Sequence, residues 1–397
     1  MNPKNSESGA SVETAGSKKS SSNSPSTAPL FGEGNGDTLD SEKVSGEISY
    51  EEYVDYDQEP PPDIVAYNEL RSCADLARLH ESGQLEIQPD FQREVIWQRP
   101  AQTRFIDSLI KQLPIPSMCF SLDQKSRKWQ VIDGLQRMTA ITKFLGDAPW
   151  KLSRLGDIDT RLSGSDNSDF KEGQHLSALR ERVENLTIPV TVIRCDYSKL
   201  SHMEFLFTIF HRLNKGGVTL NNQEIRNCIY SGRFNDLLKR IDQQLPSWNL
   251  IKPQIAGSTA RFKSVELLLR FLAFHDSVDL YSGSLPMFLN SYMQKYRNAT
   301  EEKLSAFENL IGDTSEFCAA RVLEHLPSRI GFAAWEAILV GVARNLTVAV
   351  DLGDQQIGER IAQLLRGPEL SQEALRGALS GTEKVKARIG AAIRAFA

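Results

Sequence analysis

The sequence predicts an α+β fold, in which a small mixed sheet is followed by an all-helical C-terminal region. Up to residue 197, β-forming runs alternate with runs of helical spacing, and beyond it the spacing stays helical. With 397 residues, the chain is long enough for more than one domain. We therefore expect a disordered acidic tail at 1–62, an α/β domain at 63–197 and a helical region at 198–397.

The tail is rich in Ser, Gly, Asn and acidic residues. Residues 1–62 hold 4 Lys and 12 Asp or Glu, which leaves 42 basic and 39 acidic residues in the rest of the chain. Such a composition cannot bury enough apolar surface to fold. The acidic piece around Tyr50, Tyr53 and Tyr56 is a docking segment, an autoinhibitory mimic of a polyanion or part of a plain solubilising tail. The slightly basic remainder permits contact with nucleic acid without requiring it.

Composition also bounds the class of protein. No apolar run is long enough to span a membrane, and the N-terminus lacks the apolar core of a signal peptide. We therefore expect a cytoplasmic protein with no membrane partner. The five cysteines include no C-x-x-C pair, and the six histidines have no paired ligand spacing. We expect reduced, mostly buried cysteines and no structural zinc.

The α/β domain is expected to begin with a strand at 63–70. A helix capped by Ser72 and Asp75 should follow and run to about residue 80. A second helix should begin at Pro100 and carry Phe105, Ile106, Leu109 and Ile110 on one face. We then expect a strand pair at 118–122 and 128–132 and a last strand at 188–194. Between the last two strands, residues 146–186 are polar and rich in Gly and Ser. We expect them to form a long loop or an insertion.

Amphipathic patterns predict the helices of the C-terminal region. Asn221 and Glu224 form a capping box at the start of one of them. The further amphipathic runs are 265–274, 287–296, 304–311, 332–346 and 357–365. The last helix, which ends VKARIGAAIRAFA, is basic and amphipathic. It is either a partner surface or a helix that caps the core.

The stretch WQVIDGLQRMTAITKFL at 129–145 predicts a strand, a tight turn and a helix. Its β-forming residues end at Asp133 and Gly134, and Gln136 and Arg137 follow in the first helical turn. A helix N-terminus offers unpaired N–H groups to an anion, a glycine lets the anion approach, and an arginine adds charge. This combination indicates a phosphate site, although Asp-Gly turns and solvated Gln-Arg pairs are also common without a function.

An acidic residue beside a phosphate repels it unless a divalent cation lies between them or the acid handles a proton. Asp133 therefore indicates a metal nucleotide or catalysis. A second loop, at 214–217, reads Asn-Lys-Gly-Gly. Lys215 in this loop either reaches a phosphate or lies beside a plain helix C-cap.

Four motifs in the chain resemble one known family. They are PDFQREVIW at 89–97, FIDSLIKQLPIPSMCF at 105–120, VIDGLQRMTAITKF at 131–144 and FHRLNKGGVTLNNQEIR at 210–226. Together they resemble the GmrSD N-terminal domain family, which is ParB/sulfiredoxin-like and occurs in type IV restriction enzymes and related phage-defence proteins. The resemblance covers about 65–240, and it implies that 198–240 belongs to the core of a ParB-like domain that binds and hydrolyses NTPs.

The family's D-G-Q-Q-R signature corresponds to Asp133, Gly134, Leu135, Gln136 and Arg137. Leu135 replaces the first glutamine, so an amide that could orient water or phosphate is lost. Full restriction members also carry an HNH nuclease domain, which needs a His general base and metal ligands. After residue 240, His275 and His325 each stand alone among helical patterns. We therefore expect no HNH domain in this region.

The resemblance implies a nucleotide site with catalytic and binding groups. The expected catalytic residues are Asp133, Gln136 and Arg137, the expected nucleotide-binding residues are Gln92, Arg93, Gly134, Arg137, Asn214 and Lys215, and Mg²⁺ is expected at Asp133. The expected function is an Mg²⁺-dependent NTPase module of a type IV restriction-like or phage-defence system. The alternatives are a DNA-binding or nicking module, and a hydrolysis-deficient subunit that recruits a separate nuclease or effector.

Overall fold

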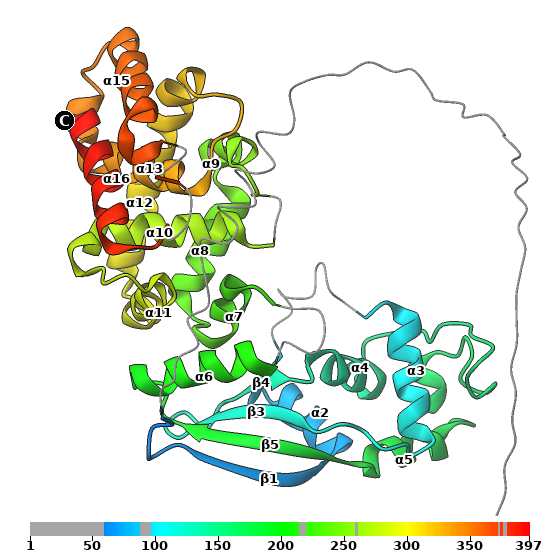
Figure 1. The fold of residues 1–397 in the computed structure, drawn as a ribbon. Coiled ribbons are helices and arrows are strands. Elements are labelled where there is room, and N and C mark those ends of the chain that lie inside the picture. The colour runs from blue at the N-terminus through cyan, green and yellow to red at the C-terminus, as the bar shows by residue number, and fades with distance from the viewer. Residues whose placement is uncertain (1–58, 88–96, 214–219, 259–260, 372–373, 376–378) are drawn as a thin grey trace, which may run out of the picture.

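The computed structural model describes residues 59–87, 97–213, 220–258, 261–371, 374–375 and 379–397. In these residues the chain forms a lobe built on a five-stranded sheet and a second lobe made of helices (Figure 1). The predicted α+β class, with a mixed sheet followed by helices, is confirmed.

The sheet is mixed. Its strands, in spatial order, are β1 Val65–Ser72, β5 Thr187–Cys195, β3 Met118–Asp123, β4 Trp129–Asp133 and β2 Leu85–Glu86. The β1–β5 and β3–β4 pairs are antiparallel, whereas the β5–β3 and β4–β2 pairs are parallel. The predicted strands are therefore present, and the last one, β5, lies between β1 and β3.

Both faces of the sheet are covered, because successive side chains of a strand point to opposite faces. One face packs against α2 Cys73–Glu81, α3 Arg99–Ile110, α4 Leu135–Leu145 and α5 Ser177–Asn185, and the other packs against α6 Leu200–Leu213. In β4, Val131 belongs to the first core and Ile132 to the second. This arrangement explains why every residue of β3 is buried.

Two predicted helix starts are confirmed by their capping bonds. The Ser72 hydroxyl accepts a hydrogen bond from the Asp75 backbone N–H at 3.1 Å, at the start of α2. Asn221 and Glu224 form the expected reciprocal box at the start of α7 Asn222–Ile229, with both bonds below 3.0 Å. Pro100 lies in the first turn of α3, and the four predicted apolar residues of that helix are buried.

The segment 146–186, expected as a long loop or an insertion, contains helical elements in its second half. A 3₁₀-helix, Asn167–Phe170, and helix α5 lie within this segment. Helix α5 was not predicted from the sequence, because only two of its residues, Leu179 and Val183, are buried and most of the others are charged or polar. These two residues are four positions apart, which is one apolar contact line of a short helix.

All five predicted helical runs of the second lobe are present, and the capping-box helix α7 precedes them. The helices after α7 are α8 Arg233–Gln244, α9 Pro246–Ile251, α10 Lys263–Ser277, α11 Leu285–Tyr296, α12 Glu301–Phe317, α13 Phe332–Arg344, α14 Leu346–Ala349, α15 Asp354–Arg366 and α16 Thr382–Phe396. Helix α16 packs along α13, and a side chain at Gly341 would lie 2.6 Å from the Ala392 carbonyl oxygen. This close packing favours the core-capping role for the last helix.

The core of the helical lobe contains a chain of buried charges. Glu266 pairs with Arg270 on α10, Arg270 lies 3.6 Å from Glu336 on α13, and Glu336 accepts a hydrogen bond from Arg388 on α16 at 2.9 Å. Each of these side chains is at most 1% exposed. Burial alone would raise the pKa of Glu266, but the nearby positive charges of Lys263, Arg270 and Arg226 lower it. The network therefore joins three helices through ionised groups.

The cysteines follow the prediction. All five are free thiols, and four of them are buried. Among the described residues, no helix has the length and apolar character that crossing a bilayer requires.

Candidate functional site

The predicted phosphate site lies where β4 ends and α4 begins. Gly134 joins them in a left-handed conformation, with φ +96° and ψ 14°. A Cβ atom at this position would lie 2.6 Å from Cγ of Met118, the first residue of β3. The absence of a side chain at Gly134 is therefore required by the turn and by Met118, a reason that the sequence did not reveal.

Arg137 and Asp133 face each other across the first turn of α4. The Arg137 guanidinium donates to Asp133 Oδ2 at 2.7 Å, to the Ser117 carbonyl oxygen at 3.3 Å and to the Pro116 carbonyl oxygen. Its side chain is 14% exposed, whereas the Asp133 side chain is 44% exposed. Arg137 thus ties the chain before β3 to the end of β4, and the carboxylate that it holds faces solvent.

Gln136 connects the junction to the chain before α3. Its side-chain oxygen accepts a hydrogen bond from the Trp97 backbone N–H at 3.1 Å. The Trp97 ring packs edge-on against Phe105, with centroids 5.5 Å apart, and adds to the core of the sheet lobe. Trp97 is therefore part of the packing of this lobe.

Four predicted nucleotide-binding residues, Gln92, Arg93, Asn214 and Lys215, lie outside the described residues. Two described segments next to these gaps approach the junction. Trp97 contacts Gln136, and helix α6 crosses the sheet toward the end of β4 that leads into α4 (Figure 1). The structure therefore brings Asp133, Gly134, Gln136 and Arg137 together.

The junction offers two kinds of chemistry. The first N–H groups of α4 have no partner inside the helix and carry partial positive charge, which favours an anion. Asp133 Oδ1 makes no hydrogen bond with the described residues and is the oxygen open to a cation. A single carboxylate suits Mg²⁺, which takes most of its ligands from phosphates and water. Within the described ranges, no three or more His, Cys, Asp or Glu residues lie close enough to form a metal-binding group.

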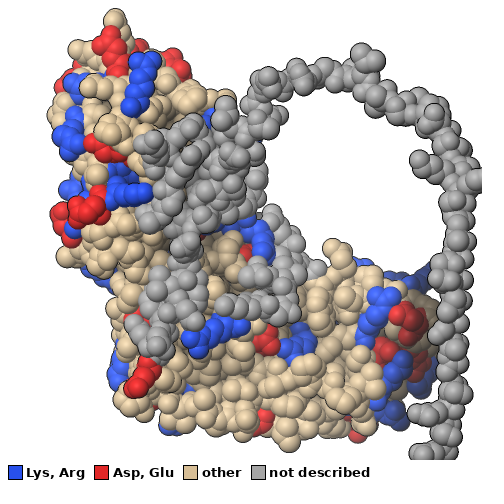
Figure 2. Space-filling view, in the orientation of Figure 1, with Lys and Arg blue, Asp and Glu red and all other residues tan. Residues whose placement is uncertain are grey.

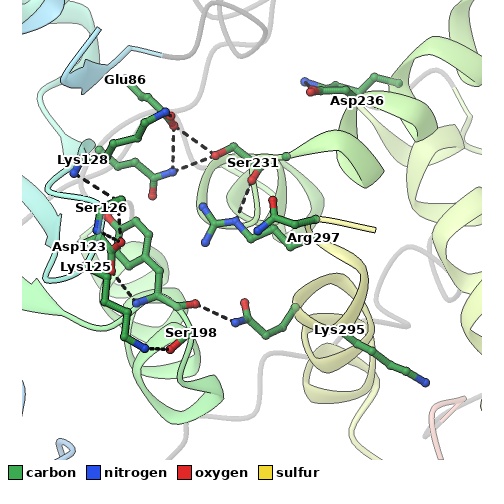
Figure 3. Close-up of a pocket in the computed structure, with 16 residues that line it drawn as sticks. Glu86, Asp123, Lys125, Ser126, Lys128, Ser198, Ser231, Asp236, Lys295 and Arg297 are labelled. Atoms are coloured by element: carbon green, nitrogen blue, oxygen red, sulfur yellow. Dashed lines mark hydrogen bonds and ion pairs between the residues drawn. The ribbon is translucent and has the colours of Figure 1, made fainter. Parts of the chain in front are cut away.

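The sequence did not reveal a second feature, a polar cavity at the opposite end of β4 (Figure 3). Its volume is about 860 Å³. The lining residues come from the β3–β4 hairpin, β2, the start of α6, the start of α8 and the end of α11; they are Glu86, Asp123, Lys125, Ser126, Lys128, Gln130, Tyr197, Ser198, Ser231, Gly232, Asp236, Lys239, Gln294, Lys295, Arg297 and Asn298. The basic hairpin turn, Lys-Ser-Arg-Lys at 125–128, is the sequence signal that could have indicated it.

Two carboxylates near this cavity are ion-paired, and one of them, Asp196, contacts the hairpin. Asp196 accepts hydrogen bonds from Ser198 and lies 3.1 Å from Lys125 Nζ. The Ser198 hydroxyl and the Lys125 ammonium lower the pKa of Asp196 to about 2. Lys199 and His202 likewise lower the pKa of Asp63 to about 2. Both carboxylates are therefore ionised at neutral pH.

These two groups predict a loss of stability in acid. Because their pKa values are lower in the folded chain than the unfolded value of about 3.9, their stabilising effect is present above about pH 4 and lost as the pH falls toward 2. We expect Asp196→Asn to be less stable than the original chain at pH 5, with a difference that shrinks by pH 2.5. Urea unfolding at both pH values measures this. An equal difference at both would contradict the role of Asp196.

Residues 75–231 match the family model described as GmrSD restriction endonuclease, N-terminal domain. The matched span runs from helix α2 to the end of α7 and contains the β4–α4 junction. The resemblance inferred from the four motifs is therefore confirmed for these residues, and it indicates a module of a restriction or phage-defence system. The chain has no match among curated proteins or solved structures.

Proposed function

We propose, from the match of residues 75–231 to the N-terminal domain of a restriction endonuclease, that this chain is the NTP-binding and Mg²⁺-dependent NTP-hydrolysing module of such a defence system. The observation that carries the proposal is the Asp133–Arg137 pair at the first turn of α4. An arginine and a carboxylate at the N-terminal end of a helix are groups that bind a metal nucleotide.

The two side chains exchange partners when the nucleotide binds. Arg137 keeps its bonds to the Pro116 and Ser117 carbonyl oxygens and turns its Nη2 from Asp133 to a phosphate oxygen. Asp133 is the residue that would hold Mg²⁺, directly or through water, and a bound ion would neutralise charge on the phosphates. The 44% exposure of Asp133 supports this exchange, because the carboxylate can turn without disturbing the core.

Gln136 is the residue proposed to orient the attacking water. Its side-chain oxygen is fixed by the Trp97 N–H, so the orientation of the amide is set before a nucleotide arrives. Asn214, Lys215, Gln92 and Arg93, which lie outside the described residues, are included in the proposal because of the family resemblance alone.

Nucleotide binding tests the proposal. We expect Arg137→Gln to weaken Mg²⁺-ATP or Mg²⁺-GTP binding about tenfold or more, since a charge-assisted bond to phosphate is lost. Asp133→Asn should remove the dependence of binding on Mg²⁺ and leave Arg137 free for the phosphate. Arg240→Gln is the matched control, because its exposed ion pair with Glu308 lies on the helical lobe.

Isothermal titration calorimetry measures these affinities, and circular dichroism checks that each variant is folded. The proposal fails if the original chain binds no NTP in the presence of Mg²⁺, or if a folded Arg137→Gln variant binds as well as the original chain.

One observation favours a hydrolysis-deficient form of this function. Leu135, which stands where the family signature has glutamine, packs against the core of the sheet lobe. Its side chain therefore offers no amide to a water molecule or phosphate. Binding of NTP without phosphate release would identify a subunit that signals to a separate effector. Release that exceeds the buffer rate and disappears in Gln136→Ala would identify an NTPase.

The DNA-binding alternative has weaker support. On the face of the molecule in Figure 2, Lys and Arg side chains are interspersed with Asp and Glu and form no continuous basic band among the described residues. A protein that tracks a DNA backbone usually presents such a band.

A further inference from the structure

The cavity between the two lobes lies apart from the proposed nucleotide site. The β3–β4 hairpin forms one side of it, and the N-terminal end of α8 and the C-terminal end of α11 form the other (Figure 3). Asp123 and Lys128 mark the hairpin end of the two strands, whereas Met118 and Asp133 mark the end that meets α4. A ligand in this cavity would therefore touch neither Asp133 nor Arg137.

Arg297 is held in place inside this cavity. Its Nε donates to the Ser231 carbonyl oxygen at 2.8 Å, and its guanidinium lies over the Tyr197 ring at 5.3 Å. The two terminal nitrogens make no hydrogen bond with the described residues, and the guanidinium extends between the two sides of the cavity (Figure 3). A planar, fixed guanidinium with both outer nitrogens available is suited to bidentate binding of a phosphate.

Four lysines also line the cavity, and the ammonium end of Lys295 points away from its centre (Figure 3). Lys125 and Lys128 belong to the hairpin, and Lys239 and Lys295 belong to the helical lobe. Lys125 Nζ donates to Ser198 at 2.7 Å, and Lys128 Nζ lies 3.5 Å from Glu86. Five cationic side chains thus line the cavity from both lobes.

The three acidic residues of the cavity are already engaged. Glu86 accepts from Lys128, Gln130 and Ser231, and Asp123 accepts from Ser126 and the Tyr197 backbone N–H. Asp236 lies 3.3 Å from Lys239. The lining carries five cationic and three acidic side chains, and this excess of two positive charges attracts an anion that enters the cavity.

Gly232 brings the start of α8 close to Arg297. A Cβ atom at Gly232 would lie 2.6 Å from the Arg297 carbonyl oxygen, so a larger residue would force the two elements apart. Because Ser231 and Gly232 line the cavity, the positive N-terminal end of α8 also faces it. The absence of a side chain at Gly232 therefore allows the N-terminal end of α8 and Arg297 to line the same cavity.

We propose that this cavity binds a phosphate-bearing ligand of about nucleotide size, at a site separate from the β4–α4 junction. The volume of about 860 Å³ falls within the usual range for small-molecule sites, which often lie between domains. The Tyr197 ring is covered by Arg297, so the ligand is recognised through its phosphates and not by stacking on that ring. Since cations come from both lobes, the bound ligand bridges them.

Inorganic tripolyphosphate is the probe for this site, because it has no base. We expect calorimetry on the full chain to show binding that weakens as salt is raised. Arg297→Gln and Lys128→Gln should each weaken it several-fold, the first about tenfold or more. Lys128 is 58% exposed on the hairpin, so its variant tests the site even if Arg297→Gln is unfolded.

Arg137→Gln separates this site from the proposed nucleotide site, and Arg240→Gln controls for a lost surface charge. Both variants should keep full-affinity binding of tripolyphosphate in the inter-lobe cavity. Arg297→Gln should lose this binding. The proposal is overturned if tripolyphosphate does not bind at millimolar concentration, if folded Arg297→Gln and Lys128→Gln variants bind as the original chain does, or if Arg137→Gln alone removes all binding. None of these results requires NTP to bind or fail to bind at the junction.

Discussion

Gly134→Ala is expected to lower the free energy of unfolding by about 2–5 kcal/mol. Two effects add at this position. The backbone has φ +96°, which a residue with a Cβ atom adopts at a cost of about 1–2 kcal/mol. The new methyl group would also lie 2.6 Å from Cγ of the fully buried Met118, which forces β3 or α4 to move. Urea unfolding followed by circular dichroism measures the change.

Two other glycines separate these effects. Gly173 has φ +78°, but no atom lies within 4 Å of the position that a Cβ atom would take, so Gly173→Ala should show the backbone effect alone. Gly312 lies in the middle of α12 with open space around it, and Gly312→Ala should raise stability by about 0.5–1 kcal/mol. Equal losses for Gly134→Ala and Gly173→Ala would show that the Met118 contact has no effect.

Glu336→Gln is expected to lower the free energy of unfolding by about 3–5 kcal/mol. The Glu336 side chain is 0% exposed and faces Arg388 and Arg270, each 1% exposed. Glutamine keeps the shape and removes the charge, so two guanidinium groups remain buried with less compensation. Urea unfolding at neutral pH measures the loss.

The exposed pair Glu308–Arg240 provides the matched control. Its side chains are 42% and 50% exposed, and Glu308→Gln should change stability by no more than about 1 kcal/mol. The double variant Glu336→Met with Arg388→Met should be more stable than Glu336→Gln, because no charge of that pair remains buried. A loss below about 1 kcal/mol for Glu336→Gln would show that water reaches the network.

Much of the sheet lobe was predictable because local signals and tertiary packing agree there. The β4–α4 junction combines β-forming residues, a turn glycine and helical apolar spacing, and the structure places its strand and helix within two residues of the prediction. Helix α5 could not be predicted, since two buried residues among polar ones give too weak a period.

The two candidate sites also differ in how far the sequence could predict them. Asp133 and Arg137 are four residues apart in the sequence, so their meeting could have been foreseen, although their bond to each other and the bonds of Arg137 to Pro116 and Ser117 could not. The inter-lobe cavity is lined by Lys125 from the sheet lobe and by Arg297 from the helical lobe. No spacing in the sequence indicates that these residues meet, because tertiary packing alone brings them together.

The place of β5 in the sheet has a consequence for how the protein is made. Strand β1 leaves the ribosome first, yet its neighbour β5 ends at Cys195, more than a hundred residues later. While translation passes through 146–186, the nascent N-terminal strand has no partner, and the edge of β3 that β5 will occupy stays open. A truncated chain that stops before β5 would lack the strand joining these two edges and be prone to self-association.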